Sequence, residues 1–478
     1  MATIGESAME SREDIPLKSG RKGSRLCSWD EEFFGGSKFI NISFAILSLI
    51  ITVALLVQIY YGDYQVTPHG SVATDSRECS AVGTSILKKG GNAVDAAIAS
   101  ALCLAVVNPH VTGLDASGQI LVYNHRTRLN PIVIDFYNKQ FSSKSLPRLL
   151  IALVYVHKKY GKVSWEDLVD PAATIARNGF LISNNLALSA ASTKAMSLFV
   201  GTLEAGQKLQ MPRLSAYLQR IGNSSVKELY NYVHSLNIPM EYTSTVSQFK
   251  EYSVFVPGNS EIALPLFANL QKINSTNVTI PDTAKPPHVL KFVEVTKRTY
   301  DEYKIVEKFY KGTSSNVAVM DLNDNYVSLI TGMTSPFGTG NLTNEGYLLD
   351  TDVQSKFPSR LPLIVTDTNY VCGKRIALGI TDVATASQII LSLVLPNANA
   401  TSSIEAPRFN ILDNGAIGIE EGHLPAYSQD VLGALKSYFK EGIEFMKEPY
   451  SSCNVVEKYA EELNSHSDSR GGGISSRF

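Results

Sequence analysis

The chain has 478 residues, of which 44% are hydrophobic and 18% are charged. Disordered chains contain fewer apolar residues and more charge, so a large part of this chain must fold around a substantial core. The 43 basic and 45 acidic side chains give a net charge of −2. This balance excludes a general nucleic-acid binder, because no basic excess is present to neutralise phosphates.

The first predicted element is an uncharged run over residues 39–61, between Lys38 and Asp63. As a helix it would span about 34 Å, and the hydrocarbon core of a bilayer is roughly 30 Å thick. A cleaved signal peptide and a buried soluble helix are the alternatives. The apolar core of a signal peptide is shorter and lies closer to the N-terminus. We therefore expect a transmembrane helix over residues 39–61.

Basic residues flank this run unequally, because Arg21, Lys22, Arg25 and Lys38 precede it and the first one after it is Arg77. Positive charge stays on the cytoplasmic side of a membrane, so we expect a single-pass type II protein. Residues 1–38 would form a cytoplasmic tail, and the body would be extracellular or lumenal. Five glycosylation sequons lie in the body, at Asn223, Asn274, Asn277, Asn341 and Asn399.

The body also carries an even number of cysteines, namely Cys79, Cys103, Cys372 and Cys453, whereas Cys27 lies in the tail. In an oxidising compartment these four can form two disulfides. The alternative is that all four are small buried hydrophobic residues.

The predicted elements of the body are helices and strands in blocks. A helix that is apolar nearly all round covers residues 92–107, and short strands follow over residues 119–123 and 132–136. Next comes a helical hairpin, with one helix over residues 149–160 and another that begins at Ser164 with Asp167 in the capping-box position. Residues 200–300 have a less regular pattern.

The pattern changes again at residue 316. Two strands flank a turn over residues 323–325, and an apolar helix over residues 384–395 ends at Pro396. Strands and helices in such blocks predict a layered α+β fold rather than a helical bundle.

Sequence motifs of common catalytic sites are missing from the chain: it contains no HExxH, CxxC, GxSxG or Walker loop. The eight histidines show no ligand spacing. We therefore expect neither a metal site nor a cofactor.

The stretch SVATDSRECSAVGTSILKKGGNAVDAAIASALCLAVVNPHVTGLDASG, residues 71–118, resembles the opening of gamma-glutamyltransferases, also called glutathione hydrolases. The resemblance continues through VIDF, KYGKVSWEDLVDPAATIARNGF, NVAVMDLNDNYVSLITGMTSPFGTG, IEAPRF and DSRGGG. It covers most of residues 63–478 and is weaker between about 200 and 310. The apolar run followed by VQIYYGD is most similar to the membrane-anchored gamma-glutamyltransferase 7 branch.

The resemblance implies an N-terminal-nucleophile hydrolase fold, a four-layer α-β-β-α sandwich. It also implies a precursor that cuts itself into a large and a small subunit, here over residues 62–313 and 314–478, which form a heterodimer only if self-cleavage occurs. The new N-terminal residue takes the γ-glutamyl group of glutathione as an ester and passes it to water or to an acceptor amine. Its α-amine, with a pKa of about 8, can act as the base. A disulfide between Cys79 and Cys103 is implied as well.

The nucleophilic threonine of the family aligns with Ser314, and a shift of one residue would move it to Thr313. Serine is competent for both self-cleavage and acyl transfer. The alternative is that residues 312–315 are only a polar turn before a strand.

The substrate-binding positions that the resemblance implies are altered. Tyr137 stands where the family has an arginine for the substrate's α-carboxylate, and Gly332 replaces a threonine that supports the nucleophile. Thr334 replaces a neighbouring asparagine. The acidic pair that holds the substrate's amino group aligns with Asp352 and Ser355, and the paired serines of the carboxylate site have no counterpart in SRLPLIV.

The oxyanion loop departs furthest from the family pattern, because its two glycines align with Asp382 and Val383. An ionised Asp382 would repel a developing oxyanion, and the loss of one oxyanion donor already slows catalysis roughly 100- to 1,000-fold. We therefore expect weak activity towards glutathione or other γ-glutamyl compounds. The alternative is a catalytically inactive relative that acts as a binding or structural membrane protein. A single span excludes a transporter.

Overall fold

The computed structural model describes residues 36–61, 68–137, 146–193, 195, 198–199, 203–235, 240–276, 285–350, 356–396 and 398–478. The chain divides into two units, residues 1–66 and 67–478. In the first unit, helix α1 spans Gly36–Tyr61, and Phe39–Tyr60 is long and apolar enough to cross a membrane. The large apolar side chains of this segment are exposed.

The second unit contains the remaining elements. Its helices are α2 (Arg77–Lys88), α3 (Ala93–Val107), α4 (Arg148–Tyr160), α5 (Trp165–Asn178), α6 (Asn184–Thr193), α7 (Pro212–Gly222), α8 (Val226–Ser235), α9 (Ala263–Asn274), α10 (Pro286–Tyr303), α11 (Ile305–Lys308), α12 (Val383–Val394), α13 (Ala400–Glu405) and α14 (Gln429–Tyr438).

Twelve strands form one antiparallel sheet, in the order β18-β17-β13-β12-β7-β6-β3-β2-β10-β9-β1-β19. In chain order they are β1 (Ser71–Ala73), β2 (Ser117–Asn124), β3 (Ile132–Asp135), β6 (Met240–Phe249), β7 (Tyr252–Pro257), β9 (Ser315–Met320), β10 (Asn325–Gly332), β12 (Leu361–Asp367), β13 (Arg375–Ile380), β17 (Val455–Tyr459), β18 (Glu462–His466) and β19 (Ser476–Arg477). Smaller sheets contain β4 (Phe180–Leu181), β5 (Lys208–Leu209), β8 (Phe309–Tyr310), β11 (Phe357–Pro358), β14 (Phe409–Ile411), β15 (Ile417–Glu420) and β16 (Ile443–Met446).

The two halves of this sheet, one containing β12 and β13 and the other β2 and β9, lie face to face. Leu121 of β2 and Met320 of β9 share one buried apolar cluster with Ile364 of β12 and Ala377 of β13. Side chains alternate along each strand, so the opposite faces must be buried by other elements. On β9, for example, Val319 packs in the cluster that contains the helices α2–α7.

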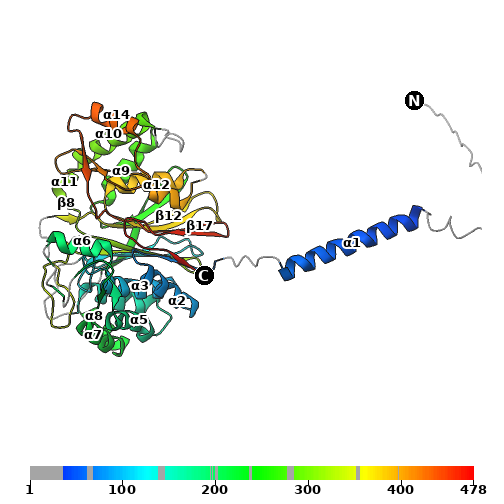
Figure 1. Cartoon of the computed structure of the whole chain (residues 1–478), viewed down its shortest axis with the longest axis horizontal. Coiled ribbons are helices and arrows are strands. Elements are labelled where there is room, and N and C mark those ends of the chain that lie inside the picture. Colours follow the sequence, from blue (N-terminus) through cyan, green and yellow to red (C-terminus); the bar gives the residue numbers. More distant parts are fainter. Residues whose placement is uncertain are drawn as a thin grey trace, which may run out of the picture. The chain divides into compact units, whose positions relative to one another are not determined.

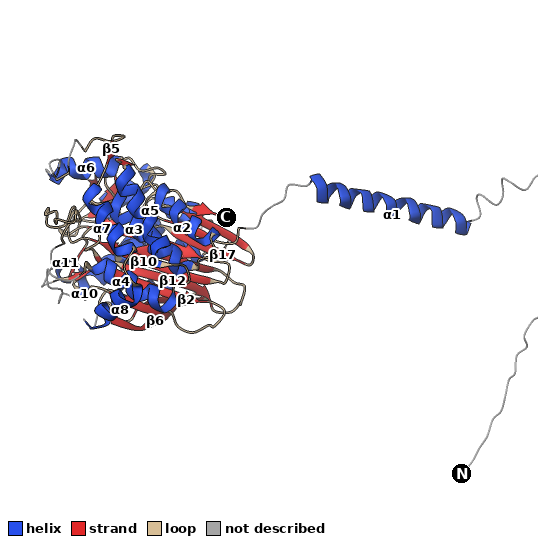
Figure 2. Cartoon of the chain, turned by 90° about the horizontal axis from the view of Figure 1, so that it is seen from below, coloured by secondary structure: helices blue, strands red, loops and turns tan. Residues whose placement is uncertain are grey.

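Helices cover both outer faces, as Figure 1 shows: α2, α3, α5, α7 and α8 lie on one side of the strands and α9, α10, α12 and α14 on the other. Figure 2 shows the strands of the body beneath the first group of helices. The result is the four-layer α-β-β-α sandwich, which confirms the predicted fold class.

Most elements begin and end close to the predicted residues, with one exception. Residues 200–300, which lack a regular pattern, contain α7, α8, α9, the start of α10 and the hairpin of β6 and β7. Strand β6 is largely exposed, and α8 buries only Val233. These elements therefore carry a weaker apolar signal than the buried helix α3, whose side chains are all buried.

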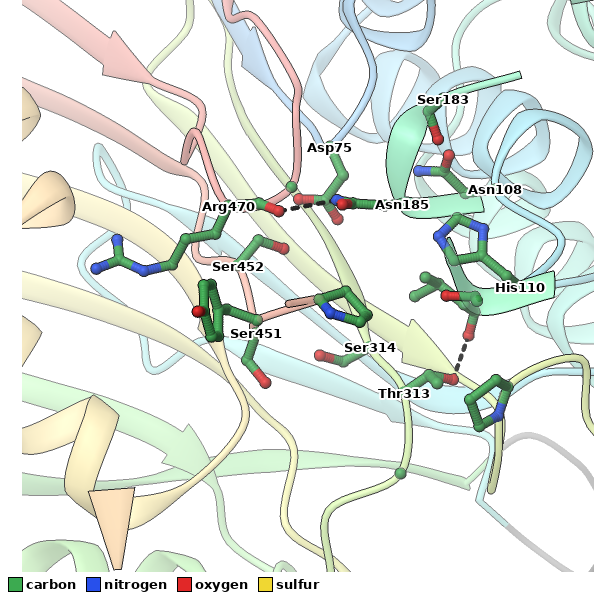
Figure 3. A pocket seen from close by; sticks show the side chains of 17 residues that line it. Asp75, Asn108, His110, Ser183, Asn185, Thr313, Ser314, Ser451, Ser452 and Arg470 are labelled. Atoms are coloured by element: carbon green, nitrogen blue, oxygen red, sulfur yellow. Dashed lines mark hydrogen bonds between the residues drawn. The ribbon is translucent and has the colours of Figure 1, made fainter. Parts of the chain in front are cut away.

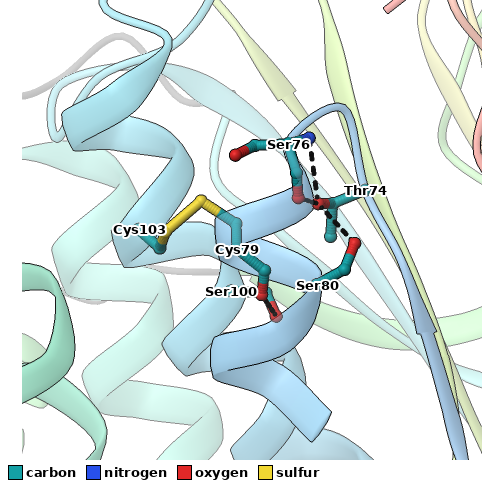
Figure 4. The surroundings of a disulfide bond; sticks show 6 residues. All are labelled: Thr74, Ser76, Cys79, Ser80, Ser100 and Cys103. Carbon is teal, nitrogen blue, oxygen red and sulfur yellow. Dashed lines mark hydrogen bonds between the residues drawn. A yellow bond between two sulfur atoms is a disulfide. The ribbon is translucent and has the colours of Figure 1, made fainter. Parts of the chain in front are cut away.

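A disulfide joins α2 to α3 through Cys79 and Cys103, with an S–S distance of 2.08 Å (Figure 4). Beside it, the hydroxyl of Ser100 donates a hydrogen bond to the backbone carbonyl of Cys79. The other two cysteines are free: Cys372 is exposed and Cys453 is buried. The structure therefore contains one of the two disulfides that the four cysteines can form.

Candidate functional site

A cavity of about 120 Å³ lies where strand β9 begins (Figure 3). Polar side chains from segments far apart in the sequence line it, including Asp75, His110, Asn185, Thr313, Ser314 and Ser452. The lining residues come from seven segments: those after β1, after α3, at α6, before β9, after β10, before β17 and after β18. The segments around β9 meet because β1 and β10 both pair with it. Both candidate nucleophiles therefore lie at one cavity.

The hydroxyl of Thr313 is held by the backbone around it. Its Oγ1 donates to the carbonyl oxygen of Val111 at 2.6 Å and lies 3.1 Å from that of Met333. The N–H of Met333 donates back to Oγ1 at 3.1 Å. An oxygen with these partners is poorly placed for attack on a substrate in the cavity.

Ser314 differs from Thr313 in this respect. It lines the cavity and is half-buried, and its side chain makes no hydrogen bond with any residue that the structure describes. Sequence alignment left Ser314 and Thr313 as alternatives. Of the two, only Ser314 has a hydroxyl without a hydrogen-bond partner among the described residues.

Ser315, the next residue, ties the start of β9 to the other wall of the cavity. Its hydroxyl donates to the carboxylate of Asp75, whose other oxygen accepts from the side-chain amide of Asn454 at 2.8 Å. Burial raises the pKa of Asp75, and hydrogen bonds from Ser315, Ser452 and Asn454 oppose this rise. The network fixes the backbone on the C-terminal side of Ser314.

His110 is buried in the same wall, and its Nδ1 has no hydrogen-bond partner within the described part of the chain. Burial lowers its pKa to about 3, so the ring is neutral at physiological pH. His110 therefore adds an imidazole to the cavity but no charge.

Arg360 contacts the backbone of the candidate site rather than the cavity. The sequence analysis did not identify this residue. Its Nη1 donates to the backbone carbonyl oxygen of Thr313 at 2.9 Å, and its Nη2 donates to the hydroxyl of Ser117 at 3.2 Å. Its guanidinium lies 5.6 Å from the ring centroid of Tyr137. Arg360 is fully buried. The one sequence signal is a charged residue directly before the apolar strand β12.

The resemblance implies an arginine at the position of Tyr137. In the structure this position is a tyrosine, and the guanidinium of Arg360 lies beside its ring. Its hydroxyl is buried without a hydrogen-bond partner among the described residues. Burial raises the pKa of Tyr137, so the phenol stays neutral. A positive charge is present beside Tyr137, but it comes from Arg360, directly before β12.

Gly332, where the resemblance implies a threonine, has no space for a side chain. A Cβ atom there would overlap the carbonyl oxygen of Thr313 and Nη1 of Arg360. Thr334 donates its N–H to the carboxylate of Asp350 at 2.9 Å, which fixes the following loop. The predicted residues Asp352 and Ser355 lie outside the described residues.

Asp382 is the N-cap of α12, and its Oδ1 accepts a hydrogen bond from the N–H of Thr385 at 2.8 Å. Its Oδ2 accepts from the hydroxyl of Thr385 at 3.2 Å, and the hydroxyl of Tyr300 lies 3.4 Å from Oδ1. Val383 is the first residue of the helix. The carboxylate is therefore engaged in capping, a role that the sequence alignment alone did not indicate.

Four of the five sequon asparagines are described, namely Asn223, Asn274, Asn341 and Asn399, and all four are exposed. Asn277 lies outside the described residues. Within the described ranges, no group of three or more His, Cys, Asp or Glu side chains is arranged to hold a metal ion.

Comparisons with known proteins agree with the fold. The Gamma-glutamyltranspeptidase family pattern matches residues 79–237. Glutathione hydrolase 7 of Mus musculus is 24% identical over 92% of this chain and 82% of its own length. Glutathione hydrolase 6 of Mus musculus is 30% identical over 63% of this chain and 62% of its own length.

The crystal structure of cephalosporin acylase from Bacillus halodurans superposes with a TM-score of 0.70 at 17% identity, over 86% of this chain and 96% of that one. This likeness shows the N-terminal-nucleophile hydrolase fold. The family pattern over residues 79–237 and the relatives that extend over 92% of the chain make this protein similar to the gamma-glutamyltranspeptidase family.

Proposed function

We propose that this protein is a membrane-anchored glutathione hydrolase and γ-glutamyltransferase of weak activity, with Ser314 as its nucleophile. The observation that carries the proposal is the contrast between two neighbouring hydroxyls. That of Ser314 lines the cavity without a hydrogen bond to the described residues, whereas that of Thr313 is bonded to two backbone carbonyls.

The chemistry has two stages. In self-cleavage, the Oγ of Ser314 attacks the carbonyl carbon of Thr313, the peptide C–N bond breaks, and the hydroxyl proton passes to the departing amine. Water then hydrolyses the ester between Thr313 and Oγ, which separates the two fragments and leaves Ser314 with a free hydroxyl beside its free α-amine. In turnover, that amine takes the proton of its own hydroxyl as Oγ attacks the γ-glutamyl carbonyl of glutathione. The γ-amide C–N bond breaks, the proton passes to the departing cysteinylglycine amine, and the γ-glutamyl group left as an ester on Ser314 is transferred to water or to an acceptor amine.

Weak activity follows from three altered positions. Tyr137 is neutral and offers no ionic grip on the substrate's α-carboxylate, which costs roughly 1.5–3 kcal/mol of binding. Gly332 supplies no hydroxyl to support Ser314. Asp382 replaces an oxyanion-loop glycine with a carboxylate that caps α12. Ground-state binding and transition-state stabilisation are both reduced.

The membrane anchor in this proposal is α1, with residues 1–38 cytoplasmic and the body extracellular or lumenal. The unequal flanking charges and the four exposed sequon asparagines support this type II orientation. Glycosidase should shift the gel band, and protease added to intact vesicles should spare a lumenal body. Digestion of the body together with unmodified sequons would contradict the orientation.

The second candidate is a catalytically inactive family member that binds a partner at the membrane. The absence of space for a side chain at Gly332 favours it, because the supporting threonine of an active site could not be accommodated there.

An assay of the full chain in detergent separates the two candidates. Glutathione and a γ-glutamyl anilide would be the substrates, and Ser314→Ala the matched variant. We expect turnover far below the enzyme median of about 10 per second, and we expect Ser314→Ala to abolish it. Turnover near 10 per second would make the protein an ordinary family enzyme, whereas no turnover from an uncleaved chain would favour the inactive relative.

A further inference from the structure

The guanidinium of Arg360 contacts the peptide group that self-cleavage would break. Its Nη1 donates to the carbonyl oxygen of Thr313 at 2.9 Å, and that carbonyl belongs to the peptide bond between Thr313 and Ser314. Attack by Ser314 on this carbonyl places a negative charge on the same oxygen. A preorganised donor at such an oxygen stabilises the tetrahedral intermediate.

Among the described residues, no acidic side chain pairs with Arg360. Its other partners are the hydroxyls of Ser117, at 3.2 Å, and Tyr310, at 3.5 Å, with the Tyr137 ring beside it. In the described part of the chain, no carboxylate lies within ion-pair distance, and Nε has no hydrogen-bond partner. A buried cation without an anion is costly, and the nearest place for negative charge to form is the Thr313 oxygen.

Gly332 is what allows this contact. A Cβ atom at that position would overlap both the Thr313 oxygen and Nη1 of Arg360. Because Gly332 has no side chain, the guanidinium of Arg360 can occupy the space beside the Thr313 carbonyl. A second arginine in place of Tyr137 would repel Arg360.

From this geometry we propose that Arg360 is the catalytic residue that stabilises the oxyanion of self-cleavage at the Thr313–Ser314 bond. The proposal rests on the proposed function, because it assumes that this bond is cleaved. Arg360 does not line the cavity and is fully buried, so the group it serves is the chain's own carbonyl rather than a substrate. The step needs only the chain and water.

The test measures the rate of self-cleavage in the full chain, by pulse labelling and reducing gels. Arg360→Gln keeps hydrogen-bonding groups but removes the charge, Arg360→Met removes both, and Arg360→Lys restores a charge. Arg375→Met is the matched control: Arg375, like Arg360, is buried and its Nε has no partner among the described residues, and it donates to the carbonyls of Val371 and Ala460.

We expect Arg360→Gln and Arg360→Met to slow cleavage about 100- to 1,000-fold, Arg360→Lys to recover part of the rate, and Arg375→Met to cleave like the unaltered chain. Thermal unfolding checks that each variant folds; if Arg360→Met does not fold, Arg360→Gln decides. Cleavage of Arg360→Gln at the unaltered rate overturns the proposed role of Arg360 but leaves the proposed function in place. A chain that is never cleaved, even unaltered, overturns the self-cleavage in the proposed function and this inference with it.

Discussion

Asn316 and Asn454 each use a side chain to bond the backbone of the other. The Nδ2 of Asn316 donates to the carbonyl of Asn454 at 3.0 Å, and the N–H of Asn454 donates to Oδ1 of Asn316 at 2.9 Å. In return, the Nδ2 of Asn454 donates to the carbonyl of Asn316 at 3.0 Å, and it also donates to Asp75. This reciprocal pair joins the strand that follows Ser314 to the segment before β17, and so fixes one wall of the cavity.

Asn454→Ala should lower the free energy of unfolding by about 2–4 kcal/mol, because it leaves buried groups of Asp75 and Asn316 without partners. Thermal unfolding would measure the loss. Asn464→Ala is the control, since Asn464 is exposed on β18. Equal stability of the two variants would contradict the role of the pair.

Gly332→Ala should destabilise the body by about 1–3 kcal/mol, since the added methyl group overlaps the Thr313 carbonyl and Arg360. Gly433→Ala is the matched control: Gly433 lies within α14 with open space around its Cβ direction. That substitution should instead stabilise the chain by up to about 1 kcal/mol. A Gly332→Ala variant that melts like the unaltered protein would show that the space at this site is not limiting.

The disulfide between Cys79 and Cys103 closes a loop with a sequence separation of 24. Chain-entropy reasoning predicts that Cys103→Ser costs about 3 kcal/mol of stability. Cys372→Ser should have little effect, because Cys372 is free and exposed. Thermal unfolding of both variants, with mass spectrometry of non-reduced peptides, would check this. Both cysteines found as free thiols would contradict the link.

His110 should make the body sensitive to acid. Its pKa is about 3 in the folded chain, below its ordinary value of 6.5, because it is buried. Between these values the unfolded chain binds the extra proton, so stability is present above pH 6.5 and falls as the pH decreases towards 3. At pH 5 the loss is about 2 kcal/mol.

His110→Phe should therefore lose less stability than the unaltered chain between pH 7 and pH 5, and His69→Gln, at an exposed position, should behave as the unaltered chain does. Thermal midpoints at the two values of pH would measure this. An identical acid response in His110→Phe would rule out His110 as its source.

The fold could be predicted from the sequence because its signals are local or shared with a family. The apolar helix α3 and the strands around residues 323–325 appear in the residue pattern itself, and the family resemblance supplied their arrangement in layers. The capping of α12 by Asp382 is also a local signal, and an acidic residue three positions before Thr385 could have indicated it.

The candidate site was less predictable, because its contacts join distant segments. The choice between Thr313 and Ser314 depends on the carbonyls of Val111 and Met333, which no alignment register can supply. The contact of Arg360 with Thr313 likewise depends on how the two halves of the sheet meet. In the sequence, Arg360 is only a charge before an apolar strand.

The N-terminal residue of the smaller fragment tests the central claim, the assignment of the nucleophile to Ser314, most directly. Mass spectrometry of the full chain after expression should find a C-terminal fragment that begins at Ser314. Thr313→Val, which removes only the neighbouring hydroxyl, should still give a fragment with this start, and Ser314→Ala should give only the intact chain. A fragment that begins at Thr313, or an unaltered chain that stays whole, would contradict the account.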